Sequence, residues 1–324
     1  MMLPAENTPP VNDLIRPARR AARFYALTVV LSWALAAVVW AAGFRWIGLV
    51  PIVVGPVYMW IPGIVAVVLA RRQHGSNWRD ALALRWRWSW LLGAALLGPV
   101  VLAVAATGVG LLLPGTSFDP TMEALFQRLH DMLTPQQIAA ARAQVTSLPI
   151  HPFWLSIPQA LLAGATVNSI AALGEELGWR GYLHQALGTM SFTRRHATIG
   201  ALWGIWHVPL ILQGHNYPRH PLQGVILMIV FCVLLAVPMG YLREASRTLV
   251  APTFFHGTLN ACAGMPLLVT AGGDDTLIGM TGLAGLLVLL ATWPVALVLR
   301  HRSPMPAGAP GAVVGGARPD AASA

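Results

Sequence analysis

Long runs of apolar residues recur along the whole chain, and they restrict its fold more than any other feature. A hydrocarbon core about 30 Å thick is crossed by a helix of about 20 residues, each rising about 1.5 Å. Eight runs approach or exceed that length: 24–43, 47–70, 90–113, 153–176, 197–213, 221–242, 248–270 and 278–299. The sequence therefore predicts an all-α fold, a polytopic membrane helix bundle of about eight transmembrane helices.

The overall composition agrees with a lipid environment. Hydrophobic residues make up 56% of the chain and charged residues only 10%, and the mean hydropathy is +0.62. Because about a quarter of the residues of a soluble domain are charged, a soluble globular class is excluded. The lysine-free sequence, rich in Ala and Arg, points to a bacterium with GC-rich DNA. We therefore expect an integral protein of a bacterial plasma membrane, with the lipid bilayer as a partner.

The basic residues are distributed unevenly about the predicted spans. All 21 are arginines, and the net charge is +9. Seventeen of the 21 fall on one side of the spans, the side of both termini, while only Arg45, Arg128, Arg142 and Arg219 fall on the other. By the positive-inside rule both termini are then cytoplasmic. This pattern reflects topology and lipid contact, so nucleic acid is not an expected partner.

The chain is expected to consist of one membrane domain between two tails. Residues 1–22 and 303–324 are rich in Pro, Gly, Ala or polar residues, and we expect disordered cytoplasmic tails there. Residues 23–302 then form the eight-helix membrane domain. The longest outer loop contains an amphipathic stretch at 121–145, which Asp119 precedes as a helix start, and it predicts an interfacial helix. None of these features indicates an oligomeric state.

Three predicted spans carry ionisable side chains, each of which costs about 2.5–3.5 kcal/mol to insert. These side chains are Glu175, His207 and His256. Counted from the predicted span ends at about 1.5 Å per residue, all three lie roughly 12–15 Å below the cytoplasmic face. Asn260 follows His256 by four residues, so both share one helix face. The sequence therefore predicts one cavity that contains all four side chains.

Neighbouring residues are assigned supporting roles. Glu176 and Arg180 have the spacing of an intrahelical ion pair, and Trp203 is expected to pack. Two pairs of glycines, Gly174 with Gly178 and Gly200 with Gly204, permit close helix approach. Four further histidines fall in predicted loops and are expected to be solvated: His184, His196, His215 and His220.

The predicted cavity suits hydrolysis of a peptide bond without a covalent intermediate. Glutamate with histidine can deprotonate a water, and histidine with asparagine can stabilise an oxyanion. The chain has no His-Glu-x-x-His, Gly-x-Gly-Asp or Gly-x-Ser-Gly motif of other proteases. Glu175, His207 and His256 could also hold a divalent metal such as zinc with an open water position, and the residues leave this choice open. Two other readings remain: a membrane transporter or proton relay, and a catalytically idle immunity or scaffold protein.

Three motifs carry a family resemblance. They are Glu175-Glu176-x-x-x-Arg180 followed by Gly181-Tyr182-Leu183, an aromatic-x-x-x-His run ending at His207, and His256-x-x-x-Asn260. In this order over about 153–270 they resemble the CAAX prenyl protease and bacteriocin-processing (CPBP) family of intramembrane glutamate endopeptidases, often labelled metalloproteases. Trp203 stands where that family usually has Phe.

The resemblance implies an eight-helix membrane endopeptidase. It implies that Glu175 and His207 activate the attacking water and that His256 and Asn260 stabilise the oxyanion. Glu176 and Arg180 would then brace the site. The implied substrate is a membrane-associated protein or peptide, cut in CAAX-type or leader processing. We expect it to reach the site laterally or from the cytoplasm.

Overall fold

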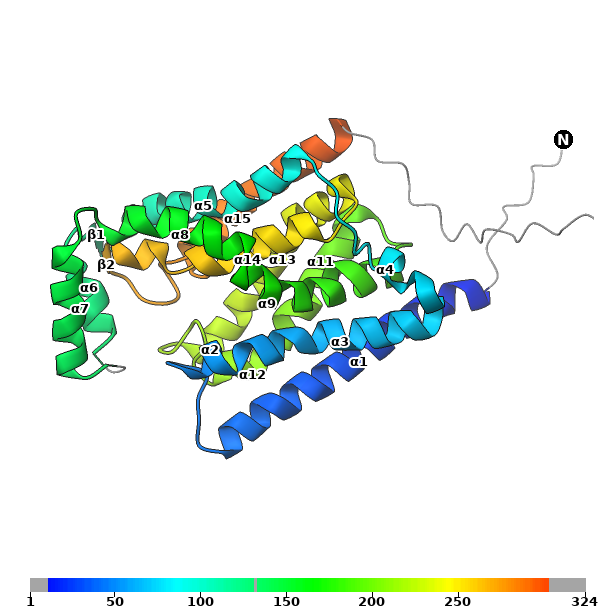
Figure 1. Ribbon diagram of the computed structural model, residues 1–324, viewed down its shortest axis with the longest axis horizontal. Helices are drawn as coiled ribbons and strands as arrows, with labels where there is room; N and C mark the ends of the chain where they lie inside the picture. Colours follow the sequence, from blue (N-terminus) through cyan, green and yellow to red (C-terminus); the bar gives the residue numbers. More distant parts are fainter. Residues whose placement is uncertain (1–10, 131–132, 303–324) are drawn as a thin grey trace, which may run out of the picture.

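The computed structural model describes residues 11–130 and 133–302, which form a bundle of long helices lying side by side (Figure 1). Five segments are long and apolar enough to cross a membrane: Pro17–Ala41 within α1 (Val11–Ala41), Val50–Ala81, α5 (Trp90–Leu111), α13 (Pro221–Ser246) and α15 (Leu283–Arg302). Their outer faces expose large apolar side chains such as Val101 and Ile226, as expected of surfaces that contact lipid. The predicted polytopic helical bundle is confirmed.

The other elements are short. The segment Val50–Ala81 consists of α2 (Val50–Val53), α3 (Gly55–His74), η1 (Gly75–Asn77) and α4 (Trp78–Ala81). Before the site region lie β1 (Thr116–Phe118), α6 (Glu123–Arg128) and α7 (Pro135–Ser147). The site region comprises α8 (Pro152–Ala165), α9 (Val167–Glu176), η2 (Leu177–Leu183), α10 (His184–Ala186), α11 (Phe192–Trp206), α12 (Val208–Leu212) and α14 (Val250–Cys262). After it come η3 (Met265–Leu268) and β2 (Thr270–Gly272).

The count of eight spanning helices is not confirmed. The predicted span 153–176 is α8 and α9, which meet at a bend of 52° and count as a sixth span only if taken together. The predicted spans 197–213 and 248–270 are interrupted, because α11 has 15 residues and α14 has 13. Proline explains both interruptions, since Pro209 and Pro266 lie in the first turns of α12 and η3 and cannot donate a backbone hydrogen bond to the preceding helix.

The expected N-terminal tail is partly helical. Residues 11–22 lie within α1, which corrects the expectation of disorder for that part of 1–22. The physical reason is composition, since Ala, Arg and Leu are good helix formers and dominate 14–22. Residues 1–10 and the expected tail 303–324 lie outside the described residues.

The amphipathic stretch 121–145 forms two helices, α6 and α7, instead of one. Asp119 precedes the first of them, which begins at Glu123, and its carboxylate accepts hydrogen bonds from the backbone N–H groups of Thr121 and Ala124, at 2.9 and 2.8 Å. A small separate core joins the two helices through Phe126 and Ile138.

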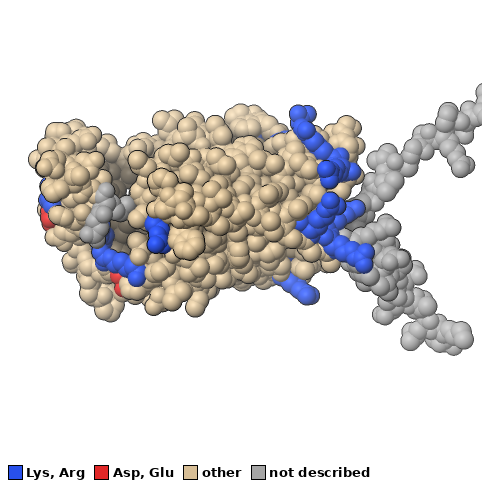
Figure 2. Space-filling view, turned by 90° about the horizontal axis from the view of Figure 1, so that it is seen from below, with Lys and Arg blue, Asp and Glu red and all other residues tan. Residues whose placement is uncertain are grey.

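The two ends of the bundle differ in character. At one end, here called the terminal end, α1 begins and α15 ends; at the other, the distal end, lie β1, β2, α6 and α7 (Figure 1). The two strands pair antiparallel, with Thr116 opposite Gly272. Arginine side chains gather at the terminal end in the view of Figure 2, and fewer lie at the distal end. The positive-inside rule associates the end with more arginine side chains with the cytoplasm.

Candidate functional site

The four predicted catalytic side chains line one cavity of about 810 Å³. Glu175 reaches it from α9, His207 from the junction of α11 and α12, and His256 and Asn260 from α14. Glu175 and His256 are buried in the protein, with exposed fractions of 3% and 4%. The helices therefore bring together the residues that the sequence predicted to converge.

Small residues allow this convergence. A methyl group added at Gly174 would lie 2.7 Å from the carbonyl oxygen of Met59, so α9 touches the backbone of α3 there. A methyl group at Gly204 would lie 2.5 Å from Cα of Ile229, so α11 touches α13 equally closely. Such contacts leave no room for a Cβ, which confirms that the small-residue spacing marks close helix packing.

Glu175 and His207 are both held by Trp203. The indole N–H of Trp203 donates a hydrogen bond of 2.6 Å to Oε2 of Glu175. The carbonyl oxygen of Trp203 lies 2.8 Å from Nδ1 of His207. Because a carbonyl can only accept, His207 must carry its proton on Nδ1, and Nε2 of the neutral ring is left with its lone pair. One residue thus orients both groups that could activate a water.

Glu176 forms its hydrogen bonds with Arg180 and His256, and none with Glu175 or His207. Its Oε1 accepts a hydrogen bond of 3.0 Å from Nη1 of Arg180 and lies 2.8 Å from Nδ1 of His256. The predicted ion pair of Glu176 and Arg180 is therefore confirmed, with both side chains completely buried. The Arg180 guanidinium also lies 4.3 Å from the centre of the Trp203 ring, within the range of a cation–π contact.

The chain just after Glu175 and Glu176 is a π-helix, η2, whose seven residues are all buried. Single π-helical turns are frequent at functional sites. Arg180 lies in this turn, and its backbone carbonyl accepts a hydrogen bond of 3.0 Å from Nε of Arg243. The turn thus ties the catalytic motif to the end of α13.

Asn260 is the one predicted site residue whose side chain is exposed, and it is exposed on the cavity wall. It makes no side-chain hydrogen bond to another described residue, so its amide N–H groups remain available to a ligand. His256, one helical turn earlier, presents its ring edge to Trp203 at a centroid distance of 5.3 Å. The two residues lie on the same wall, as their spacing of four predicted.

The same side chains do not fit a shared metal ion in this arrangement. Within 11–130 and 133–302, the donor atoms of Glu175, His207 and His256 do not all lie within 4.8 Å of one another. The hydrogen bonds given above engage Oε2 of Glu175 and Nδ1 of both histidines, which leaves Oε1 and the two Nε2 atoms free, so it is the separation of the donors that argues against a shared ion. No step of the chemistry is therefore assigned to a metal.

The cavity extends from these residues towards the distal end. Its outer part is lined by four segments near the distal loops: 46–59, 125–129, 215–219 and 274–281. None of the described loop residues at the terminal end lines it. Of the two expected routes, lateral or from the cytoplasm, a route from the side of the termini therefore finds no corresponding channel among these residues.

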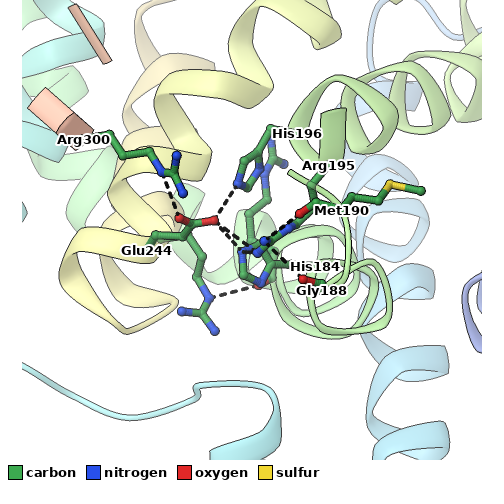
Figure 3. Close-up of polar contacts among 9 residues, drawn as sticks. His184, Gly188, Met190, Arg195, His196, Glu244 and Arg300 are labelled. Atoms are coloured by element: carbon green, nitrogen blue, oxygen red, sulfur yellow. Dashed lines mark hydrogen bonds and ion pairs between the residues drawn. The ribbon is translucent and has the colours of Figure 1, made fainter. Parts of the chain in front are cut away.

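A cluster of charged side chains lies instead at the terminal end, around Glu244 (Figure 3). Its carboxylate lies 3.4 Å from His184, 3.2 Å from His196 and 3.2 Å from Arg195, with Arg300 at 3.5 Å on its other oxygen. The donor atoms of His184, His196 and Glu244 lie close enough together to hold a metal ion. However, Nη1 of Arg195 is 3.1 Å from Nε2 of His184, so the guanidinium already supplies the positive charge there. The cluster ties α10, α11, α13 and α15 together at the terminal end.

Sequence reasoning missed several of these roles. His184 and His196 were expected to be solvated, but His196 lies in α11 with an exposed fraction of 0%. His215, expected to be solvated as well, lines the cavity. Trp203 was expected only to pack, whereas its N–H holds Glu175. The signal available for Trp203 was its indole four residues before His207, a polar residue of the same predicted span. The histidine contacts could not be predicted, because their partners are distant in the sequence.

Comparison with known proteins finds the same family resemblance over this part of the chain. A family model described as type II CAAX prenyl endopeptidase, Rce1-like, matches residues 157–262. The CAAX prenyl protease 2 of Methanococcus maripaludis is 29% identical over 97 residues, which is 28% of this chain and 36% of that protein. The aligned stretch thus spans little more than a third of the relative. The resemblance expected from the three motifs is confirmed, and all the predicted site residues lie inside the matched segment.

Proposed function

We propose that this protein is an intramembrane endopeptidase that hydrolyses peptide bonds of membrane-associated proteins or peptides. The observation that carries the proposal is the single cavity wall shared by Glu175, His207, His256 and Asn260. Its match to a family of CAAX prenyl endopeptidases supports the same reaction class. Substrates of the CAAX or leader type are compatible with a cavity whose inner wall is mainly apolar.

In the proposed reaction, Glu175 accepts a proton from a water molecule while the water oxygen attacks the carbonyl carbon of the substrate. The lone pair on Nε2 of His207 accepts the second hydrogen bond of that water and orients it. As the tetrahedral adduct collapses, the bond to nitrogen breaks and Glu175 returns the proton to the leaving amine. Trp203 keeps Glu175 in place through its 2.6 Å hydrogen bond.

Negative charge that develops on the carbonyl oxygen requires donors on the same wall. The side-chain amide of Asn260 and Nε2–H of protonated His256 would supply them. Nδ1–H of His256 donates to Glu176, and Arg180 shares that carboxylate. This division leaves Glu175 as the base and Glu176 as a positioning group.

A proton relay fits the arrangement less well. A relay needs titratable groups from one side of the membrane to the other. Between Glu176 and Glu244 the described contacts pass through Arg180 and Arg243. Arginine does not lose its proton in proteins, so these contacts offer no path for one.

The function is tested by cleavage of a quenched fluorescent peptide in liposomes, with wild type and His207→Ala compared. Removal of the water-orienting imidazole is expected to lower kcat by about a hundredfold or more. His301→Ala is the matched control, since His301 is exposed in the last turn of α15. Equal activity of all three proteins would contradict the proposal.

A chelator is expected to leave the wild-type rate unchanged, because the donor atoms of Glu175, His207 and His256 do not converge on one ion. A loss of activity that zinc restores would refute the absence of a catalytic metal.

We further propose that substrates enter at the distal end, which the positive-inside rule places outside the cytoplasm. Asn216 is exposed on the distal part of the cavity, and Asn77 is exposed at the terminal end. In intact cells a membrane-impermeant maleimide should label Asn216→Cys, and it should label Asn77→Cys only after permeabilisation. The native Cys232 and Cys262 are buried and should not react. The reverse labelling pattern would place the cavity mouth in the cytoplasm.

A further inference from the structure

The outer part of the catalytic cavity carries charge that the proposed hydrolysis does not use. Most of the wall beyond Glu175 is apolar, formed by side chains such as Met228, Phe231 and Leu267. Four charged residues interrupt it at the distal mouth: Arg128, Arg219, Asp274 and Asp275. A charge at the rim of an apolar cavity orients whatever enters it.

Arg128 is fixed in place without a directly paired carboxylate among the described residues. Its Nη1 donates to the carbonyl oxygen of Thr270 at 2.8 Å, and its Nη2 donates to that of Gly272 at 2.7 Å. These acceptors are uncharged, and no described carboxylate lies within 4.0 Å of the guanidinium. Burial lowers the pKa of Arg128 and the positive charge of Arg219 lowers that pKa further, whereas the carboxylate of Asp119 raises it. The two cations are therefore close enough to repel each other.

Arg219 presents its side chain to the mouth with no described partner. Its backbone N–H donates to Oδ2 of Asp275 at 2.8 Å, which fixes the main chain. Its guanidinium makes no hydrogen bond or ion pair with any residue in 11–130 or 133–302. Arg128 and Arg219 also line a second hollow of about 190 Å³, together with Gly272 and Gly273 of the β2 turn.

The two aspartates at the mouth are occupied elsewhere. Oδ1 of Asp274 accepts hydrogen bonds from the backbone N–H and the hydroxyl of Thr276, at 2.8 and 2.6 Å. Oδ1 of Asp275 lies 2.6 Å from Nδ1 of His220, and this contact raises the pKa of His220. His220 therefore offsets part of the negative charge of the two aspartates. Neither aspartate forms an ion pair with the guanidinium of Arg128 or Arg219 among the described residues. Two neighbouring guanidinium groups over a small hollow attract an anion that can lie between them.

We propose that Arg128 and Arg219 form an anion subsite at the distal mouth, which binds a carboxylate of the substrate while the catalytic residues act on a peptide bond deeper in the cavity. The inference rests on the proposed endopeptidase function, because it names a chemical requirement of that substrate. Guanidinium groups bind carboxylates through paired, charge-assisted hydrogen bonds. The carboxylate can come from the chain end or from an acidic side chain, and these two sources are distinguishable by experiment.

Binding is measured first, so that the subsite is tested independently of catalysis. Ala-Leu-Phe-Leu with an uncharged dansyl label is compared as the free acid, as the C-terminal amide, and as an amide extended by one Asp, on the Glu175→Gln protein. We expect one of the two carboxylate probes to bind about tenfold or more tightly than the plain amide. Arg219→Gln should abolish that preference, and Arg128→Gln should reduce it. Which carboxylate probe is preferred identifies the source.

Arg142→Gln is the matched control, because Arg142 lies on the same distal end, pairs with Glu123 and does not line the cavity. It should leave the preference intact. Equal binding of all three probes to the Glu175→Gln protein would overturn the subsite, as would an equal effect of Arg219→Gln and Arg142→Gln.

Cleavage then separates the two proposals. In the active protein Arg219→Gln should raise KM about tenfold for the preferred carboxylate peptide, with kcat nearly unchanged and the amide peptide unaffected. If no peptide is cut but the binding preference depends on Arg219, the anion subsite stands and the endopeptidase function fails. If peptides are cut with no preference, the function stands and the subsite fails.

Discussion

Glu175→Gln is expected to lower kcat by about 10²- to 10⁴-fold, the loss typical when a general base is removed. Gln has nearly the same shape and can still accept the indole N–H of Trp203, which lies 2.6 Å from Oε2 in the wild type. It cannot accept a proton from water, so the chemical step fails while the fold is kept. The measurement is single-turnover cleavage of a quenched fluorescent peptide in liposomes, together with thermal unfolding to verify the fold.

Two companion variants sharpen this prediction. Trp203→Phe removes only the donor to Glu175, since Phe keeps most of the ring, and a smaller loss of about tenfold is expected. Glu123→Gln is the matched control, because Glu123 is outside the cavity and pairs with Arg142; it should retain the wild-type rate. A Glu175→Gln protein within a few fold of wild type would exclude Glu175 as the base.

Much of the site could be predicted because its rules are local. The ion pair of Glu176 and Arg180 follows from a spacing of four residues on one turn. The close approach of α9 to α3 follows from Gly174, which needs no knowledge of its partner. Because a polar group in lipid is costly, Glu175 and His256 were predicted to face a cavity instead of the lipid. Each of these signals is contained within a short stretch of sequence.

Other features depend on contacts between distant segments, which no local rule predicts. The contact between His256 and Glu176 joins residues 80 positions apart. His196 was expected to be solvated because it falls in a predicted loop, yet its ring packs against Gly240, where a methyl group would lie 2.3 Å from Nδ1. Hydropathy also counts apolar residues without detecting where a helix stops. The runs at 197–213 and 248–270 were therefore predicted as spans, although α11 ends at Trp206 and α14 at Cys262.

The interrupted spans and the site are physically related. His207 follows directly after α11, and its Nδ1 reaches back to the carbonyl of Trp203, the residue four positions earlier. A break in a helix within a membrane is tolerated where the freed backbone groups line a cavity. The cavity thus accounts for the break in the helix at His207, and the break places His207 on the cavity wall. Hydropathy alone could detect neither the break nor the cavity.

Arg180→Met is expected to lower the free energy of unfolding by about 3–5 kcal/mol, because it leaves the buried carboxylate of Glu176 without its guanidinium partner. Both side chains have an exposed fraction of 0%, so water cannot replace the lost contact. The variant also loses the stacking of Arg180 on Trp203, at 4.3 Å from the ring centre. The measurement is equilibrium unfolding in mixed detergent micelles, with the fold followed by circular dichroism.

The double variant Glu176→Gln with Arg180→Met tests whether the uncompensated charge causes this loss. Removing both charges together should recover part of the stability, because Gln carries no charge to strand in the interior. Arg142→Met is the surface comparison: it breaks an ion pair whose side chains are 42% and 43% exposed, and it should cost less than about 1 kcal/mol. A double variant no more stable than Arg180→Met alone would show that packing against Trp203 and Met239, and not the ion pair, is what Arg180 contributes.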